Sequence, residues 1–280
     1  MIWNIVADSS CDLRKADIEC SAVGFDTVPF IFKIGDAEYV DEENLDTMTL
    51  IEAMENCSTA SSSACPSPHA WEELFMKAEN TIAITISGNL SGSLNSALLA
   101  KENVLADHPE KKIAVLDSCS TGPECAMCIR KVAEWIKEGL DFETIVARGE
   151  EFLKNTRTCF ALSSFDNLVK NGRMSRLAGF MAKALGMWGI GIASDEGTIV
   201  MRGKSRGSTK ALALILDYMQ KSNFSGGTVA ISHCCNLPMA EMLKTSILSQ
   251  WPNTNVDFLE TRGLDSYYAE RGGLIVAFGK

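Results

Sequence analysis

The feature that most constrains the fold of this chain is an alternation of short apolar runs with longer segments of helical periodicity. The runs are rich in β-branched residues, which is typical of strands, and lie at Ile2–Ala7, Val28–Ile34, Thr81–Ile86 and Ile113–Leu116. Helices are expected between them, over residues 47–57, 68–79, 91–106 and 123–138. Because strands that alternate with helices usually form a parallel sheet with helices on its faces, the sequence predicts an α/β fold.

The pattern changes after residue 157, following a further helix over residues 141–155. The remaining elements are expected as strands, helices and one hairpin, namely Thr158–Leu162, short helices around 165–184, the hairpin Met187–Ser194 with Thr198–Lys204, helices 208–221 and 237–250, and strands Thr228–Ser232, Val256–Glu260 and Leu274–Phe278. We therefore predict two domains. Residues 1–157 form a mainly parallel sheet flanked by helices, and residues 158–280 form a mixed α/β domain.

Composition excludes several classes of protein. Hydrophobic residues make up 46 % of the 280 residues, enough for a sizeable core. The net charge of −10 disfavours nucleic acid as a partner, since an acidic surface repels phosphates. No segment is long and apolar enough to span a bilayer, and the N-terminal residues lack the pattern of a signal peptide. The expected location is therefore the cytoplasm.

Serine-rich segments mark the most informative candidate site. Both are expected to be loops: one is Ser61–Pro68, before a predicted helix, and the other is Ser87–Ser93, between a predicted strand and a helix. Asp8–Ser10 and Asp117–Ser120 also follow strands, so these polar strand ends should meet at one sheet edge. Hydroxyl groups and the free N–H groups of a helix N-terminus suit an anion, although helix capping is the other common use of serine.

A second motif, Gly203–Gly207, has the G-x-S-x-G spacing of a hydrolase nucleophile elbow around Ser205. Asp217 and His233 are the only nearby partners for a triad. The preceding strand is predicted to be a hairpin arm rather than a central parallel strand, which argues against an elbow. A serine-dependent acyl hydrolase, using Ser91, Ser93 or Ser205, remains as an alternative hypothesis.

The cysteines do not indicate a metal site. Cys125 and Cys128 form a single C-x-x-C pair, and the three histidines, His69, His108 and His233, are remote from it in the sequence. A redox role is conceivable for such a pair, but buried thiols in a helix are the usual reading. We expect neither a metal nor a cofactor.

Several short motifs together resemble the DegV family of fatty acid-binding proteins, over essentially the whole chain. The similarity rests on their order and spacing, with Ala7–Leu13 resembling T-D-S-x-x-D-L, Ser63–Pro68 resembling T-S-Q-P-S-P, Ser87–Ser93 resembling S-S-x-L-S-G-T, Val115–Ser118 resembling V-x-D-S, Lys170–Ser175 resembling K-G-G-R-I-S, and Lys204–Ala211 resembling a later family motif. The resemblance implies a two-domain α/β fold that buries one long-chain fatty acid between its domains.

The same resemblance implies roles for individual residues. Ser63 matches the carboxylate-binding Thr of the family, and Ser91, Gly92 and Ser93 match a loop that also holds the carboxylate. Tyr268 falls where the family often has His, which keeps a hydroxyl donor but not a titratable imidazole.

The resemblance also implies partners. Family members in some bacteria present the bound acid to a separate kinase, which phosphorylates the carboxylate with ATP for phospholipid synthesis. Arg173 is the residue expected to face that kinase or a membrane surface. The chain would then be a non-catalytic lipid carrier, with an acyl hydrolase or a lipid-sensing interaction protein as the alternatives.

Overall fold

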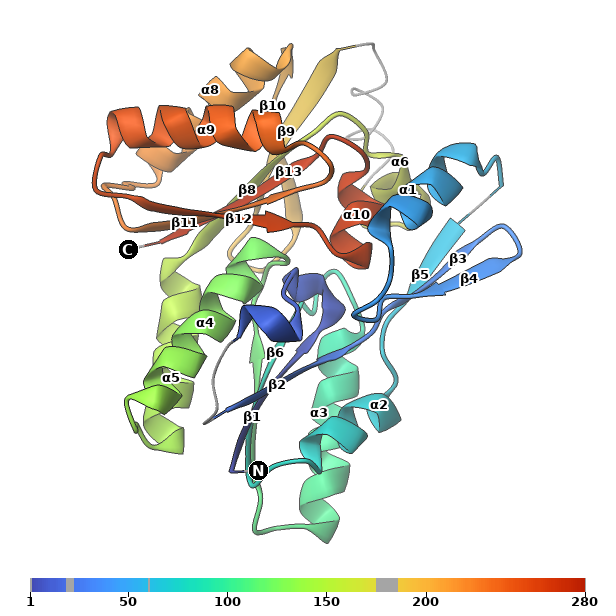
Figure 1. Cartoon of the computed structure of the whole chain (residues 1–280), viewed down its shortest axis with the longest axis vertical. Coiled ribbons are helices and arrows are strands. Elements are labelled where there is room, and N and C mark those ends of the chain that lie inside the picture. The colour runs from blue at the N-terminus through green and yellow to red at the C-terminus, as the bar shows by residue number, and fades with distance from the viewer. Residues whose placement is uncertain (1, 19–22, 60, 175–185, 280) are drawn as a thin grey trace.

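The structure is a computed structural model that describes residues 2–18, 23–59, 61–174 and 186–279. It contains two larger sheets, one above the other in Figure 1, and a small three-stranded sheet at the side of the lower one. The last strand of the lower sheet ends at Asp117, and the first strand of the upper sheet begins at Arg157. The predicted domain limits at residues 157 and 158 remain a prediction.

The lower sheet is entirely parallel, with the strand order β2-β1-β6-β7. Its strands alternate with helices as predicted, and the bounds are β1 Trp3–Asp8, β2 Gly24–Val28, β6 Asn80–Thr85, β7 Lys112–Asp117, α2 Pro68–Phe75, α3 Ser93–Asp107, α4 Pro123–Lys137 and α5 Phe142–Asn155. Helices α2 and α3 cover one face, and α4 and α5 cover the other. Side chains on both faces of the strands are buried, which explains their continuous apolar sequence.

The upper sheet is mixed, with the order β10-β9-β8-β13-β11-β12, and β11 with β12 is its parallel pair among the described strands. The bounds are β8 Arg157–Leu162, β9 Met187–Ala193, β10 Ile199–Arg206, β11 Thr228–His233, β12 Asn255–Glu260, β13 Leu274–Gly279, α6 Asp166–Lys170, α8 Ser208–Lys221, α9 Leu237–Gln250 and α10 Gly263–Ala269. Helices α8 and α9 cover its outer face (Figure 1). Helix α4 packs against both sheets, so one apolar cluster joins them.

The α/β fold class is confirmed, but two local predictions are wrong, and two elements, α10 and β4, were not predicted. The run Val28–Ile34 is two strands, β2 and β3, because Pro29 between them cannot donate to a sheet ladder. Residues 61–64 form a strand, β5, rather than a loop, because they pair with β3 in the small sheet. Helix α10 was not predicted, since seven residues give little periodicity. Part of the predicted helical segment 165–184 lies outside the described residues.

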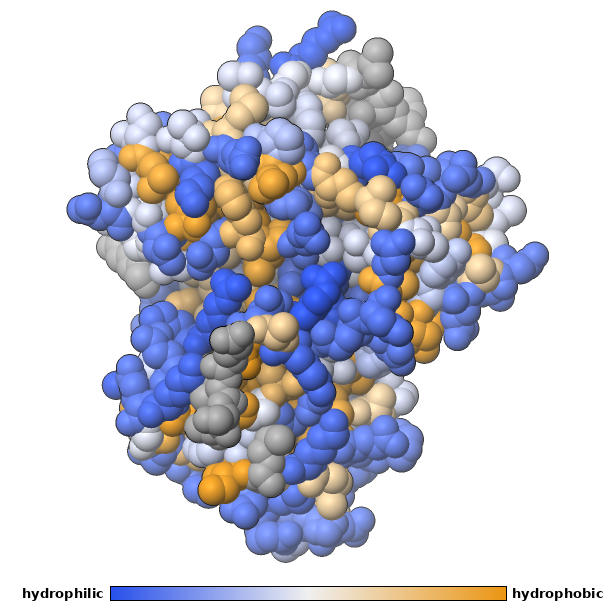
Figure 2. Space-filling model, in the orientation of Figure 1, coloured by the Kyte–Doolittle hydropathy of each residue, from blue (hydrophilic) through white to orange (hydrophobic). Residues whose placement is uncertain are grey.

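The small sheet has the order β4-β3-β5, with bounds β3 Ile31–Ile34, β4 Ala37–Val40 and β5 Ser61–Ala64, and α1 Thr47–Asn56 packs beside it. Polar side chains cover most of the face in Figure 2, with apolar residues in small groups between them. Within the described ranges, no helix has the length and apolarity needed to cross a membrane.

Candidate binding site

Two aspartates organise the serine loop at the carboxyl edge of the parallel sheet. Asp8, at the end of β1, accepts hydrogen bonds from the Ser93 hydroxyl at 2.6 Å and from the Ile86 N–H at 3.0 Å. Asp117, at the end of β7, accepts from the Gly88 N–H at 3.3 Å. Burial raises the pKa of Asp8, and these donors oppose that shift. The predicted convergence of polar strand ends is therefore present, and its hydrogen bonds fix the loop that carries Ser91.

A cavity lies between the two larger sheets, beside this loop. The space in and at the mouth of this cavity that protein atoms do not fill, open solvent included, is about 780 Å³. Most of its wall is apolar and comes from both halves of the chain, including Phe30, Ile86, Leu90, Phe160, Leu162, Leu168, Ile199, Leu264, Ala269 and Ile275. A concave, mostly apolar wall with a few polar groups is typical of small-molecule sites.

Polar residues gather at one part of this wall. The hydroxyl groups of Ser63 on β5 and Tyr268 on α10 lie 2.7 Å apart and share a hydrogen bond. Only one of the two hydroxyl hydrogens is needed for that bond, so the other can be donated to a ligand. Burial raises the pKa of Tyr268, which keeps its phenol protonated and able to donate. Ser91 and Arg173 line the same cavity.

Ser91 and Arg173 add further donors. The Ser91 oxygen accepts from the Ser93 N–H at 3.2 Å, which leaves its own hydrogen for an acceptor in the cavity. The Arg173 guanidinium donates to the Leu90 carbonyl oxygen at 3.1 Å and to the Asn171 carbonyl oxygen. Since both residues also line an adjoining surface recess, they lie where the cavity meets that recess. Hydroxyl groups beside a guanidinium suit a carboxylate.

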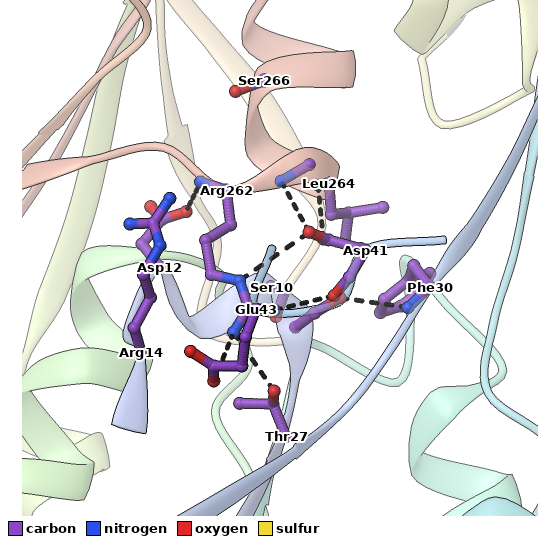
Figure 3. A network of polar contacts seen from close by, with 12 residues as sticks. Ser10, Asp12, Arg14, Thr27, Phe30, Asp41, Glu43, Arg262, Leu264 and Ser266 are labelled. Atoms are coloured by element: carbon purple, nitrogen blue, oxygen red, sulfur yellow. Dashed lines mark hydrogen bonds and ion pairs between the residues drawn. The ribbon is translucent and has the colours of Figure 1, made fainter. Parts of the chain in front are cut away.

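Helix α10, which carries Tyr268, is fixed by a buried charged network (Figure 3). Asp41 accepts the N–H groups of Gly263 and Leu264, each at 3.0 Å, at the first turn of the helix. The Arg262 side chain, only 1 % exposed, donates to the backbone oxygens of Asp41 at 2.7 Å and Leu13 at 2.8 Å. These bonds join the C-terminal helix to the N-terminal half of the chain and so position one wall of the cavity.

A pair of buried carboxyl groups lies behind the same helix. Asp265 Oδ1 accepts from the Thr121 hydroxyl at 2.8 Å, and Asp12 Oδ1 accepts from the Arg262 N–H at 2.7 Å. Their other oxygens both lie against Gly122. Burial raises the pKa of Asp12 to about 6, and burial together with the neighbouring Asp12 raises that of Asp265 well above its usual range. Burial therefore favours the neutral, protonated form of Asp265.

The residues predicted for the site divide into two groups. Ser63, Ser91, Tyr268 and Arg173 come together around the cavity. Gly92 lines only the adjoining recess, and the Ser93 hydroxyl is turned toward Asp8. Ser175, in the motif of Arg173, lies outside the described residues.

Sequence reasoning missed the polar residues that support the site. Asp41 and Arg262 are far apart in the chain, and only the fold shows that they meet. Asp41 lies in the segment Tyr39-Val40-Asp41, where a carboxylate directly after a strand was the available signal. Arg262 and Asp265 lie in no recognisable pattern.

The other motifs have structural roles. Ser205 lies on β10, which pairs antiparallel with β9, and its hydroxyl donates to the Gly207 carbonyl oxygen at 3.4 Å. Asp217 forms an exposed ion pair with Lys221, so the polar partners of Ser205 and Asp217 are not those of a Ser-His-Asp triad. Cys125 and Cys128 are buried thiols of α4, and burial raises the pKa of both. Among the described residues, no group of three or more His, Cys, Asp or Glu is placed to hold a metal ion.

Fold and site together define a class of two-sheet α/β proteins with an apolar cavity between the sheets and hydroxyl donors at one part of its wall. The chain belongs to the DegV family, whose model (uncharacterised protein, DegV family) matches residues 2–272. It is 38 % identical over 278 residues to a DegV domain-containing protein of Streptococcus pyogenes serotype M1, covering 99 % of both chains.

Two solved structures are similar over nearly their whole length. The first is the fatty acid kinase (Fak) B3 protein of Streptococcus pneumoniae loaded with linoleic acid, with a TM-score of 0.97, 38 % identity and coverage of 100 % of this chain and 99 % of that one. The second is a DegV family protein of Eubacterium eligens loaded with heptadecanoic acid, with a TM-score of 0.94, 33 % identity and 99 % coverage of both chains.

Proposed function

We propose that this protein binds one long-chain fatty acid in the cavity between its two sheets. The observation that carries the proposal is an apolar cavity with Ser63, Tyr268, Ser91 and Arg173 grouped on its wall. The two similar structures loaded with linoleic and heptadecanoic acid support it. In this proposal residues 1–157 and 158–280 are two domains, and the second closes over the ligand.

The energetics of the cavity agree with this ligand class. Burying a methylene group contributes about 0.8 kcal/mol, so about twelve buried methylenes contribute on the order of 10 kcal/mol. Loss of translational and conformational freedom offsets several kcal/mol of this, which leaves binding in the micromolar range from the tail alone, and the carboxylate contacts add to it. The carboxylate is proposed to accept from Ser63, Ser91 and Tyr268 beside the Arg173 charge. Gly92 and Ser93 would act through the backbone of their loop, with Ser93 holding it to Asp8.

We further propose that the protein is a non-catalytic carrier in the cytoplasm that presents the carboxylate to a fatty acid kinase, with transient membrane contact for loading. The similarity to the pneumococcal fatty acid kinase B3 protein supports the kinase partner. Arg173 and Gly92, which line the recess next to the cavity, would face that partner. The kinase would transfer the terminal phosphoryl group of ATP to a carboxylate oxygen, which yields an acyl phosphate and ADP.

Mass spectrometry of small molecules released from the denatured protein tests the binding. We expect one long-chain fatty acid per chain, and a dissociation constant about tenfold higher in Ser63→Ala, which removes one donor. Ser62→Ala is the matched control, because the neighbouring serine of β5 points to the opposite, exposed side. A protein that is empty and takes up no added fatty acid would contradict the proposal.

The kinase step is tested by adding a bacterial fatty acid kinase catalytic subunit with ATP and trapping acyl phosphate with hydroxylamine. We expect hydroxamate only when both proteins are present. A loaded protein that yields no product with the kinase of its own organism would favour a lipid-sensing role. Product formed without a kinase would instead show that the chain is itself an enzyme.

A further inference from the structure

The wall of the cavity contains a second set of polar residues, separate from those proposed for the carboxylate. This inner polar group consists of Ser120, Thr121, Thr158 and Asp265. Ser120 is 2 % exposed, and Thr158 and Asp265 are each 3 % exposed. A cavity that binds only a hydrocarbon chain has no use for such residues, since burying polar groups against methylenes costs free energy.

The hydrogen bonds within the inner polar group leave a defined set of donors and acceptors. The Thr121 hydroxyl donates to Asp265 at 2.8 Å, and the Thr158 hydroxyl donates to Glu124 at 2.6 Å. Each of these hydroxyl oxygens can still accept a hydrogen bond. The Ser120 hydroxyl lies near the Glu124 carboxyl group but forms no hydrogen bond with any described residue. Among the described residues, Ser120 therefore has no hydrogen bond of normal geometry, and its hydroxyl group can both donate and accept.

The inner polar group lies along the cavity rather than at the carboxylate. Asp265 and Tyr268 both line the cavity and are three residues apart on α10. Residues with this spacing lie on the same face of a helix, about one turn apart. A chain held by its carboxylate at Tyr268 therefore passes the inner polar group partway along its length.

We propose that the inner polar group binds a hydroxyl group carried partway along the acyl chain, so that the ligand class includes hydroxylated long-chain fatty acids. The inference rests on the proposed function and deepens it. Ser120 donates to the oxygen of the ligand hydroxyl, and that hydroxyl donates to the oxygen of Thr121 or Thr158. A keto group could use only the first of these bonds, and a double bond offers only a weak acceptor.

Binding of a matched series of ligands tests this inference. Dissociation constants are measured for octadecanoic acid, cis-octadecenoic acid and each positional isomer of monohydroxylated octadecanoic acid. We expect one isomer to bind at least as tightly as octadecanoic acid, and the others to bind about tenfold or more weakly, because their hydroxyl groups are buried without a partner. The matching position identifies the carbon atom that faces Ser120.

Two variants assign the effect to the inner polar group. In Ser120→Ala, the affinity of the preferred isomer relative to octadecanoic acid should fall about tenfold. Thr81→Val, which removes a buried hydroxyl group of β6 that does not line this cavity, should keep the native ratio. Thr158→Val gives a second measurement of the ratio if Ser120→Ala does not fold.

The outcomes distinguish the two proposals. Equal weakening of all hydroxylated isomers, a preference for cis-octadecenoic acid alone, or an unchanged ratio in Ser120→Ala would overturn this inference while octadecanoic acid still binds. Failure of every acid to bind would overturn the proposed function, and this inference with it.

Discussion

Tyr267 and Tyr268 are neighbours in the chain but point to different surroundings. The Tyr268 hydroxyl meets Ser63 on the cavity wall, whereas the Tyr267 hydroxyl meets Ser61 at 2.7 Å and Asn171 at 3.0 Å away from it. Each tyrosine thus pairs with its own serine of β5. The pairs have the same chemistry, but only the first is accessible to a ligand in the cavity.

This difference gives a matched test. Tyr268→Phe keeps the ring and removes one donor, so we expect fatty-acid affinity to fall about tenfold, by isothermal titration. Tyr267→Phe removes a hydroxyl of the same kind and should lower stability by about 1 kcal/mol without a comparable loss of affinity. Equal affinities of the native and Tyr268→Phe proteins would exclude the Tyr268 hydroxyl as a carboxylate donor.

The buried pair Asp12 and Asp265 predicts a dependence of stability on pH. The folded-state pKa of both groups is raised by burial, that of Asp12 to about 6, so their neutral forms are favoured in the folded state. Their contribution to stability is therefore fully present below the ordinary Asp pKa of 3.8 and is lost as pH rises through about 6 and above.

Asp265→Asn tests this dependence, because the amide keeps the shape and cannot ionise. Its oxygen can accept from Thr121 and its NH₂ group can donate to Asp12. When the pH is raised from 5 to 8, the midpoint of thermal unfolding should fall further in the native protein than in the variant. The variant lacks one of the two carboxyl groups that ionise over this range. Parallel curves for the two proteins would contradict a raised pKa at Asp265.

At this scale the sequence predicted three hydroxyl groups and the cation Arg173, all of which line the cavity, while their role as carboxylate ligands stays a prediction. Ser63, Ser91 and Tyr268 were found because motif order places them, and the structure brings them to one cavity. Asp265 was not predicted, and Ser120 was predicted only as part of the polar strand end Asp117–Ser120, since what makes both residues unusual is burial. Burial depends on which helix covers which sheet, and a single sequence does not specify that contact.

Helix α10 shows how an element too short to be stable alone can position a site. It has seven residues, and isolated helices of that length are marginal in water. Asp41 supplies the acceptors for its first N–H groups, and Arg262 joins that carboxylate to the rest of the chain. The orientation of Tyr268 thus depends on contacts made at the other end of the helix.

Arg262→Met should therefore weaken both the fold and the site. The variant leaves the Asp41 carboxylate buried without its cation, which costs about 3 to 5 kcal/mol in the free energy of unfolding in urea. Arg271→Met is the control, because Arg271 pairs with Glu55 near the end of the same helix at an exposed position, where an ion pair contributes about 0 to 1 kcal/mol. Similar losses in the two variants would show that the buried network does not hold α10.

Gly122, just before α4, illustrates a second constraint between elements. Its φ is +53°, and a Cβ atom there would overlap Asp265 Oδ2 and lie 2.9 Å from Asp12 Oδ2. Gly139 also has a positive φ, of +80°, but no atom within 4 Å of a Cβ. Gly122→Ala should thus cost about 1 to 3 kcal/mol more than Gly139→Ala in urea unfolding, because only the first adds steric overlap. Equal costs would mean that the carboxyl pair can move away.

Element types were largely predictable, and element partners were not. The predicted bounds of α4, α5 and α8 are close to the observed ones, because the sequence of each helix has one clearly apolar face. Strand β5 was read as a loop because Ser61–Ser63 has no apolar alternation. Its conformation depends on its pairing with β3, which is distant in the sequence. The intrinsic β propensity of its residues does not predict that pairing.

At the scale of the whole molecule, the cavity wall is assembled from both halves of the chain, so a bound ligand should stabilise them together. A ligand at a hundred times its dissociation constant stabilises the folded state by about 2.7 kcal/mol. For a chain of this size that corresponds to a rise of about 5 °C or more in the midpoint of thermal unfolding. Delipidated protein should therefore unfold at a lower temperature than protein reloaded with octadecanoic acid.

Methyl octadecanoate, which has the same tail without the charge, should give a clearly smaller rise in the unfolding midpoint, because Ser63, Ser91 and Arg173 then have no carboxylate to bind. Equal rises for the acid and the ester would mean that the tail alone is recognised. No rise with either would mean that the cavity between the sheets does not hold an acyl chain.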